Sequence, residues 1–349
     1  MKNIYNNLHS NQKIFIYEML KRGISVEILD EKREIILASY KDHCEIFKDR
    51  DSSIMPYNVS VLAGDKGFTK KILMRNNISV PIGEVFSINN IEGIKEAFKV
   101  LDCPVVLKPT FGSHGFDVHT NIKSEKELLI AINEISKSRG LVNVLIEEYF
   151  KAKEYRLFIT KHGDFAVLHR DPASIIGNGV NSIKELIDIE NYKRMHPRVN
   201  SLCPIIIDDE VKKYLSEKNL SLNSIPSNNK KIYLRDNSNV AVGGISIDYT
   251  NQVHKSVIDT GLKVLSSFPG LPYAGIDFMT NNIDKKQTDY SYRIIEVNTV
   301  PGAHMHLRPA IGEPHNIAKY IIDMIFPETI CKGDEYEKSD AKIKSLLRE

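Results

Sequence analysis

The stretches YAGIDFM (273–279) and YRIIEVN (292–298) decide the fold of this chain. Both are rich in apolar, β-branched and aromatic residues, and the polar residues 280–291 lie between them, so we predict two paired strands joined by a loop. Because side chains alternate between the two faces of a strand, Glu296 and Asn298 are expected on one face. Asp277 interrupts the apolar run of the neighbouring strand.

These three polar side chains predict a metal site. Asp, Glu and Asn present hard oxygen ligands, which suit Mg²⁺, an ion that keeps several waters and shares the phosphates of a substrate. For Asp277 alone, a solvated residue at a strand end is the better interpretation. For Asp277, Glu296 and Asn298 together, embedded in apolar strands, a metal site is favoured.

The rest of the chain alternates helical and extended patterns with hairpins, which favours an α+β or mixed α/β fold over a purely parallel sheet. Capping boxes at Ser124 and Ser182 predict the starts of two helices, and Pro314 is expected in the first turn of the helix NIAKYIIDMIF. The other predicted helices cover residues 11–22, 66–76, 252–267 and a segment from about residue 209. The other predicted strands cover residues 26–29, 33–40, 105–107, 143–150, 155–160, 165–169 and 230–235.

Composition bounds the class of protein. The chain has 349 residues, of which 42% are hydrophobic and 26% charged, so we expect two or three folded units and not a disordered chain. A formal charge of +2 argues against a nucleic-acid or anionic-membrane binder. There is no apolar run of membrane-spanning length, and the start MKNIYNNLHSNQKIF has no apolar signal core. Four scattered cysteines without a CxxC motif indicate reduced thiols in a cytoplasm, each expected as a small core residue.

Two lysines and a glycine loop are candidate phosphate ligands. Lys108 ends a predicted buried strand and precedes the small-residue loop Gly112, Ser113, His114 and Gly115, whose backbone N–H groups have room to approach a phosphate. A G-x-x-G pattern alone is weak support, because glycine turns are common. Lys66 follows Asp65 at a helix start and on its own would be a surface lysine.

Three further groups are less specific. Glu147 lies in a strand that runs into a turn at Tyr149 and Phe150, which is suitable for an adenine edge, and Glu154 follows at a distance suitable for ribose; adjacent acids more often form a solvated face. Arg170 and Arg235 end strands near turns and are equally suitable as anion clamps or surface residues. A zinc site at His304, His306 and His315 is disfavoured beside oxygen ligands. The sequence has no Walker A motif and no G-x-S-x-G motif.

In combination these motifs resemble the ATP-grasp superfamily. The segment with MLKRGISVEILDE and DKGFTKKIL is similar to the region entering the ATP-grasp module of bifunctional γ-glutamylcysteine synthetase–glutathione synthetase. The segment IIEVNTVPGAHMHLRP looks more like cyanophycin synthetase. The resemblance covers about residues 15–327. It implies an α+β ATP-grasp fold, in which two mixed or antiparallel sheets with flanking helices hold the nucleotide.

The resemblance also implies a division of the chain and a role for each site residue. Residues 1–62 would precede the ATP-grasp domain of residues 63–330, whose lid covers about 108–150, and residues 331–349 would form a charged tail. The implied ATP ligands are Lys66, Lys108, Gly112, Ser113, His114, Gly115, Glu147, Tyr149, Phe150 and Glu154. The implied Mg²⁺ ligands, with Mn²⁺ as an alternative ion, are Asp277, Glu296 and Asn298. The implied catalytic arginines of the acyl-phosphate region are Arg235, Arg170 and Arg156.

The activity that the resemblance implies is ATP-dependent joining of a carboxylate to an amine through an acyl phosphate. The expected substrates are amino acids or short peptides, as in a glutathione-like reaction or the extension of a peptide by one residue. A phosphotransferase and a silent ATP-binding regulatory module are the alternatives. Relatives commonly self-associate, so a homo-oligomer is an expectation. Ala241-Val242 stands before Gly243-Gly244 where relatives usually have Ser or Thr, which leaves the substrate contacts there open.

Overall fold

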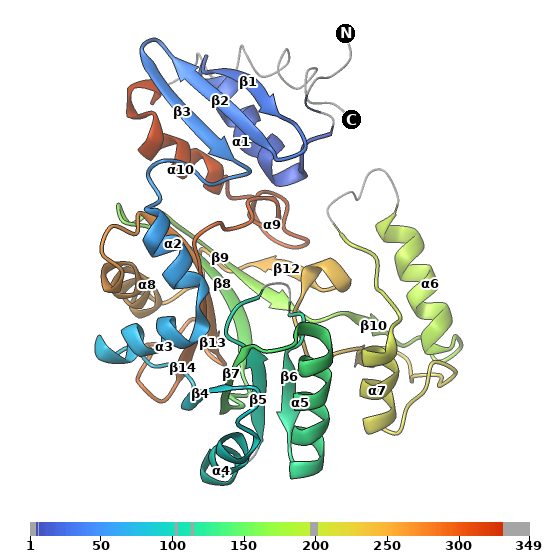
Figure 1. Ribbon diagram of the computed structural model, residues 1–349. Coiled ribbons are helices and arrows are strands. Elements are labelled where there is room, and N and C mark those ends of the chain that lie inside the picture. Colours follow the sequence, from blue (N-terminus) through green and yellow to red (C-terminus); the bar gives the residue numbers. More distant parts are fainter. Residues whose placement is uncertain (1–4, 6, 102–103, 113–114, 196–201, 331–349) are drawn as a thin grey trace.

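The computed structural model describes residues 5, 7–101, 104–112, 115–195 and 202–330. Within these residues, helices and strands mix around four separate sheets (Figure 1), as predicted for an α+β fold. Every strand pairing within these sheets is antiparallel. Among the described residues, no helix has the length and apolar character that crossing a bilayer requires.

The stretch YAGIDFMT forms the second strand from one edge of the largest sheet. This five-stranded sheet has the order β12 (Ile245–Asp248), β9 (Phe165–Asp171), β8 (Lys153–Thr160), β13 (Tyr273–Thr280) and β14 (Tyr292–Asn298). All residues of β13 except Met279 are buried. The predicted hairpin and the predicted pair of strands are therefore confirmed, and both lie in one sheet.

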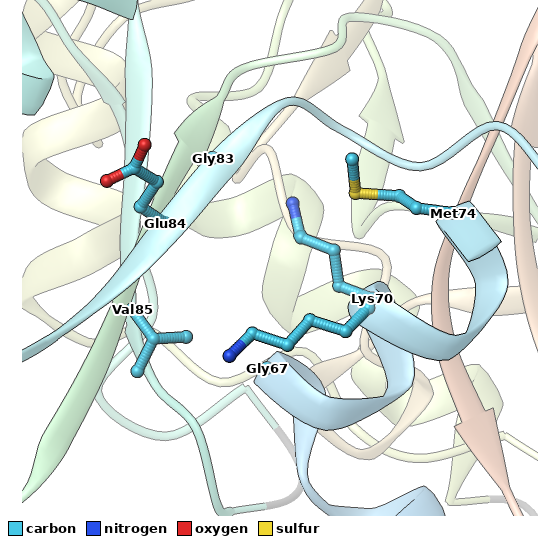
Figure 2. A pocket seen from close by; sticks show the side chains of 7 residues that line it. Gly67, Lys70, Met74, Gly83, Glu84 and Val85 are labelled. Atoms are coloured by element: carbon cyan, nitrogen blue, oxygen red, sulfur yellow. The ribbon is translucent and has the colours of Figure 1, made fainter.

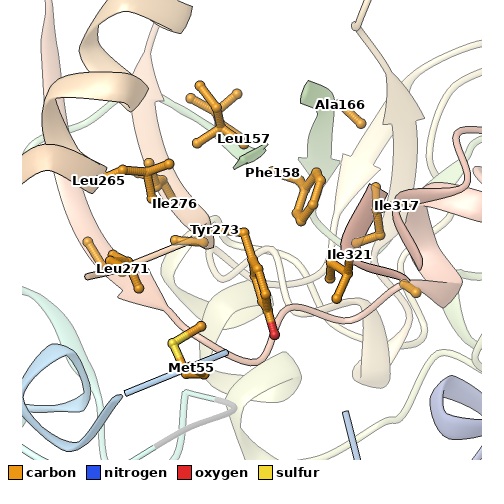
Figure 3. Packing of buried hydrophobic residues seen from close by; sticks show 14 of the residues in the cluster. Met55, Leu157, Phe158, Ala166, Leu265, Leu271, Tyr273, Ile276, Ile317 and Ile321 are labelled. Atoms are coloured by element: carbon orange, nitrogen blue, oxygen red, sulfur yellow. The ribbon is translucent and has the colours of Figure 1, made fainter. Parts of the chain in front are cut away.

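The core of this sheet is built from apolar side chains of β8 and β13. Phe158 and Ile276 are fully buried and pack with residues of α8 (Lys255–Ser267) and of α10 (Ile317–Ile325), as Figure 3 shows. The same core includes residues of α2 (Tyr57–Gly64) and α3 (Lys66–Arg75). It therefore fixes α3 beside the strands that carry the predicted metal ligands.

A four-stranded sheet forms a second layer with its own core. Its order is β4 (Gly83–Ser87), β7 (Asn143–Glu148), β5 (Val105–Pro109) and β6 (His119–Ile122), with α4 (Ile91–Leu101) and α5 (Glu125–Arg139) packed on it. Ser124 caps α5 as predicted by accepting a hydrogen bond from Glu127 N, whereas the Glu127 carboxylate accepts from Lys123 N. This sheet lies below the larger one in Figure 1.

The N-terminal part packs against helix α10. Helix α1 (Ser10–Lys21) covers the three-stranded sheet of β1 (Ser25–Asp30), β2 (Ile35–Tyr40) and β3 (His43–Lys48), and it contacts α10 at the top of Figure 1. Arg22 Nη1 lies 2.6 Å from Asp323 Oδ1, which ties the two ends together. The predicted start of α10 at Pro314 is wrong: Asn316 is the N-cap and accepts a hydrogen bond from Lys319 N, so the helix begins at Ile317.

A third apolar core supports a small side module, at the right of Figure 1. It contains α6 (Ile183–Arg194), α7 (Asp209–Glu217) and the two-stranded ladder of β10 (Ser174–Ile176) and β11 (Lys231–Tyr233). The capping box predicted at Ser182 is present, since Ser182 and Glu185 accept each other's backbone N–H. The expectation that every cysteine lies in the core is wrong for Cys44, which is exposed. The short helix α9 (His304–Leu307) and the 3₁₀ turns Val240–Val242 and Pro327–Thr329 complete the described elements.

Candidate functional site

Helix α3 brings a lysine to the edge of the predicted metal site. Asp65 caps the helix by accepting hydrogen bonds from Gly67 N and Phe68 N, so that Lys66 begins the first turn. Lys66 Nζ donates to Gly112 O at 2.7 Å and lies 3.7 Å from Glu296 Oε2. Burial lowers the pKa of Lys66, and the Glu296 carboxylate only partly opposes this. Lys66 is thus a largely buried cation between the glycine loop and β14, and not the surface lysine that it would be alone.

The three predicted metal ligands share one face of the larger sheet. Asp277 and Glu296 are direct partners across β13 and β14, and Asn298 pairs with Gly275 two residues along. Alternation along each strand therefore places all three side chains on the same face. The prediction that these residues converge near Lys66 agrees with this geometry.

Two arginines already hold Asp277. Arg156 Nε donates to Asp277 Oδ1 at 2.6 Å, and Arg170 Nη2 donates to Asp277 Oδ2 at 2.8 Å. Burial raises the pKa of Asp277, but the two guanidinium groups outweigh burial and keep the pKa below its ordinary value. Arg170 also forms an ion pair with Glu154, which in turn accepts a hydrogen bond from Ser238. The predicted catalytic arginines Arg156 and Arg170 therefore converge on the predicted metal site.

The donor set fits a hard cation that shares its shell with a ligand. Among the described residues no cluster of three or more His, Cys, Asp or Glu side chains is arranged to hold a metal. Two carboxylates and an amide nevertheless leave most coordination positions to water and phosphate, which is the usual arrangement for Mg²⁺. The zinc alternative finds no such cluster in the described part of the chain: His315 faces Asp248 Oδ1 at 3.2 Å, and His306 is fully buried.

A second cluster of charges lies in the four-stranded sheet. Lys108 Nζ lies 2.5 Å from Glu147 Oε1, and Lys70 Nζ lies 2.6 Å from Glu147 Oε2. Burial raises the pKa of Glu147, but the ammonium groups of Lys108 and Lys70 outweigh it and lower the pKa overall. Glu147, predicted as an adenine ligand, is thus first of all the counter-ion of two lysines.

Sequence reasoning did not identify Lys70. The available signal was its spacing: Lys70 follows Lys66 by four residues, which places both lysines on one side of a helix. Unless the buried carboxylate of Glu147 is known, that spacing indicates a solvated helix face. Its partner comes from a strand far along the chain, and no local pattern specifies that pairing.

The predicted adenine edge is partly occupied by internal contacts. The Tyr149 N–H donates to Pro104 O at 3.0 Å, so only the carbonyl of Tyr149 remains for a base. The Phe150 ring stacks under the guanidinium of Arg293, whose Cζ lies 4.8 Å from the ring centroid. Arg293 Nε in turn donates to Glu148 Oε1 at 2.9 Å. These contacts fix the strand end that would face the base.

Arg235, the third predicted catalytic arginine, pairs with the start of α7. Its buried guanidinium donates to Glu210 Oε2 at 3.0 Å, to Ile206 O at 2.9 Å and to Asp208 Oδ2 at 3.2 Å. All three partners belong to the start of α7 and the segment before it. The role of Arg235 in the acyl-phosphate region, which the resemblance implies, stays a prediction, because these contacts do not test it.

The glycine loop is described only at its edges. Gly112 and Gly115 both have positive φ, at 145° and 75°, a region that favours glycine. Ser113 and His114 lie outside the described residues. Before the loop, Phe111 O accepts a hydrogen bond from Arg139 Nη1 at 3.3 Å, and Arg139 also pairs with Asp117. The loop therefore joins a segment that α5 holds in place.

A surface pocket of about 290 Å³ lies between α3 and β4. Figure 2 shows Lys70 and Met74 on the helix side, and Glu84 and Val85 on the strand side. None of the predicted ATP or metal ligands lines it. The pocket lies next to the predicted nucleotide site, because Lys70 and Gly83, which line it, both contact Glu147.

Comparison with known proteins gives two groups of relatives. The chain is 32% identical over 332 residues to the glutathione biosynthesis bifunctional protein GshAB of Clostridium perfringens, a match that covers 92% of this chain and 42% of that protein. It is 35% identical over 269 residues to cyanophycin synthetase of Crocosphaera subtropica, covering 76% of this chain and 30% of that protein. The chain therefore spans less than half the length of these curated relatives. No protein-family model matches it.

One solved structure carries the same fold over nearly the whole chain. The crystal structure of a bifunctional glutathione synthetase from Pasteurella multocida superposes with a TM-score of 0.67 and 27% identity. The match covers 93% of this chain and 44% of that one. The arrangement of sheets and helices described above is therefore shared with a solved relative.

Proposed function

The chain belongs to the ATP-grasp superfamily, and from this premise we propose that it is an ATP-dependent ligase that joins a carboxylate to an amine. The observation that carries the proposal is the meeting of Lys66, from α3, with Glu296 and the arginine-held Asp277 on one face of the larger sheet. A triphosphate and its metal need such alternating cations and carboxylates in one place.

The residues have four roles in this proposal: they contact the phosphates, the metal, the base and the ribose. Lys66 and Lys108 neutralise charge on the transferring phosphoryl group, and the loop from Gly112 to Gly115 covers it. Asp277, Glu296 and Asn298 would hold Mg²⁺, or Mn²⁺ in its place, and the ion would neutralise phosphate charge when bound. Glu147, with the backbone at Tyr149 and Phe150, faces the base, and Glu154 faces the ribose.

The arginines act on the second half of the reaction. The carboxylate substrate attacks the γ-phosphate of ATP in line, which breaks the bond to the β–γ bridging oxygen, releases ADP and gives an acyl phosphate. The amine then displaces phosphate from the acyl phosphate to give the amide. Arg156 and Arg170 donate to Asp277. In this proposal they orient the anionic intermediate. Water must be kept out because it would hydrolyse the acyl phosphate, and residues 108–150 are the proposed lid.

The proposed substrates are an amino acid or a short peptide as acid, and an amino acid as amine. This proposal follows the relatives, which are named for the synthesis of glutathione and of cyanophycin. A glutathione-like addition of glycine to γ-Glu-Cys and a one-residue extension of a peptide are the two reactions to test first. We place the reaction in the cytoplasm, because Cys44 and Cys203 are free thiols.

The test is a phosphate-release screen over amino-acid and dipeptide pairs, with mass spectrometry of the products. Glu296→Gln and Lys108→Ala are expected to lower the rate of ADP formation by at least about a hundredfold, whereas Lys71→Ala, an exposed lysine of the same helix, keeps the wild-type rate. Circular dichroism checks that the variants fold. Full turnover by either site variant contradicts the assigned roles, and a stable phosphorylated product would indicate a phosphotransferase instead.

A further inference from the structure

Lys70 is a buried cation for which the proposed reaction has no role. Its side chain is only 7% exposed, and its ammonium group donates to Pro81 O and lies 2.6 Å from Glu147 Oε2. Lysine is rarely buried in proteins unless it is paired. It is also one helical turn from Lys66, so a single short helix carries both lysines.

Glu147 lies between two lysines, each of which pairs with one of its carboxylate oxygens. Its other oxygen lies 2.5 Å from Lys108 Nζ, and the residue is only 3% exposed. Its backbone is also fixed, because β4 crosses it closely at Gly83: a Cβ on Gly83 would lie 2.5 Å from Glu147 Cα. The backbone that carries this carboxylate is therefore closely packed against β4.

The charges of this cluster sum to one positive charge. Two ammonium groups and one carboxylate leave a surplus of +1, and the cluster is buried, where unbalanced charge is strongly felt. Without Lys70, Glu147 and Lys108 would cancel each other. A phosphate approaching Lys108 would then meet a neutral pair, and one oxygen of Glu147 would repel it.

We propose that Lys70 is a positioning residue that neutralises Glu147, so that the charge of Lys108 remains available to the triphosphate. Lys70 acts through Glu147 and needs no contact with the nucleotide. This inference rests on the proposed function in one respect, the assignment of Lys108 to the phosphates. The surplus positive charge attracts the polyphosphate part of a nucleotide. It does not contribute to binding of the base.

The test compares ATP with adenosine, which lacks the phosphates. Dissociation constants are measured by calorimetry on the full chain for the wild type, Lys70→Met, the double variant Lys70→Met with Glu147→Gln, and Lys71→Met. Lys71 is the matched control, because it is the adjacent lysine of α3 and is exposed. The ratio of the adenosine constant to the ATP constant isolates the contribution of the phosphates from any change at the base.

Lys70→Met is expected to lower this ratio by about tenfold or more, because charge-assisted contacts are the stronger ones. The double variant restores the ratio to about the wild-type value, since removing both charges again leaves Lys108 with a surplus of +1. Lys71→Met leaves it unchanged. A purely structural role of Lys70 would weaken ATP and adenosine equally and would not be rescued by Glu147→Gln.

Three outcomes separate the inference from its premise. An unchanged ratio in Lys70→Met, or a double variant that folds but is not rescued, overturns the inference. If Lys70→Met does not fold, the double variant tests the inference by itself. A wild-type ratio of the adenosine and ATP constants in that variant is expected only if the charges of Lys70 and Glu147 cancel in the wild type. A wild-type chain that binds no ATP at all overturns the proposed function instead.

Discussion

Each of the two main sheets holds one buried carboxylate between two cations, but the cations differ. In the larger sheet Asp277 lies between Arg156 and Arg170, which come from neighbouring strands of the same sheet. In the smaller sheet Glu147 lies between Lys108 of that sheet and Lys70 of α3, which packs with the larger sheet's core.

The two kinds of cation differ in whether they can change their charge. An arginine stays protonated at every accessible pH and offers a planar fork, so the Asp277 cluster is rigid and permanently charged. A lysine is a point charge that gives up its proton when burial makes the charge costly. The Glu147 cluster can therefore adjust its charge, and it links the two sheets.

The largest effect is expected from breaking the arginine cluster. Asp277→Asn leaves Arg156 buried without a carboxylate, and Arg156 cannot shed its charge. Breaking a buried pair in this way costs about 3–5 kcal/mol. The measurement is the free energy of unfolding in urea against wild type. A loss below about 1 kcal/mol, the range of exposed pairs, would show that the pair is not effectively buried.

His306 shows what burial does to an ionisable group whose ring nitrogens have no hydrogen-bond partner among the described residues. Burial, aided by the nearby charge of Arg156, lowers the pKa of His306 from 6.5 to about 3. The unfolded chain therefore binds a proton as the pH falls below 6.5, while the folded chain does not. Stability is lost progressively between pH 6.5 and about 3, by up to roughly 4 kcal/mol.

The check is urea unfolding of wild type and His306→Gln at several pH values in that window. The variant lacks the titrating ring, so its stability should change less with pH than that of the wild type. Parallel pH profiles for the two proteins would show that other groups cause the acid sensitivity.

The smallest effect is expected in the lysine cluster. Glu147→Gln leaves Lys70 and Lys108 facing each other, but one of them can release its proton, so the cost at neutral pH is about 1–3 kcal/mol. The folded pKa of Lys70 is already lowered, and the variant lowers it further. The unfolded chain then binds the extra proton, so raising the pH toward 10.5, the ordinary lysine value, relieves the variant.

The recovery of stability at alkaline pH distinguishes the lysine cluster from the arginine cluster. The stability difference between wild type and Glu147→Gln should shrink from neutral to alkaline pH, whereas the difference for Asp277→Asn should not. Unfolding curves of both variants at two pH values test this directly. Equal behaviour of the two variants would remove the distinction between arginine and lysine clusters.

Local sequence patterns predicted much of this geometry. Alternation in YRIIEVN places Glu296 and Asn298 on one face, and that property depends only on the strand itself. Ser182 caps its helix through a residue three positions away. By contrast, α2 has no side-chain cap, and the hairpin of β2 and β3 turns at Lys41, which adopts a positive φ of 53° without glycine. The strand β2 was predicted, but α2 and β3 were not.

In the candidate site too, contacts between residues distant in sequence were not predicted. The partners of Lys70 and Arg235 come from strands and segments distant in sequence, so spacing alone cannot reveal them. Pro314 was predicted in the first turn of α10 because proline is compatible with that position. The helix instead begins after Asn316, whose side chain accepts the capping hydrogen bond. The residues that the sequence identified were those that their own strand or helix orients.

Helix α3 joins the two sheets through side chains that are a single turn apart. Each added or deleted residue in an α-helix rotates all that follows by about 100°. A change in length between Lys66 and Lys70 would thus turn one ammonium group away from its sheet while leaving the other in place. We therefore expect this turn to tolerate substitutions between the two lysines but not insertions or deletions.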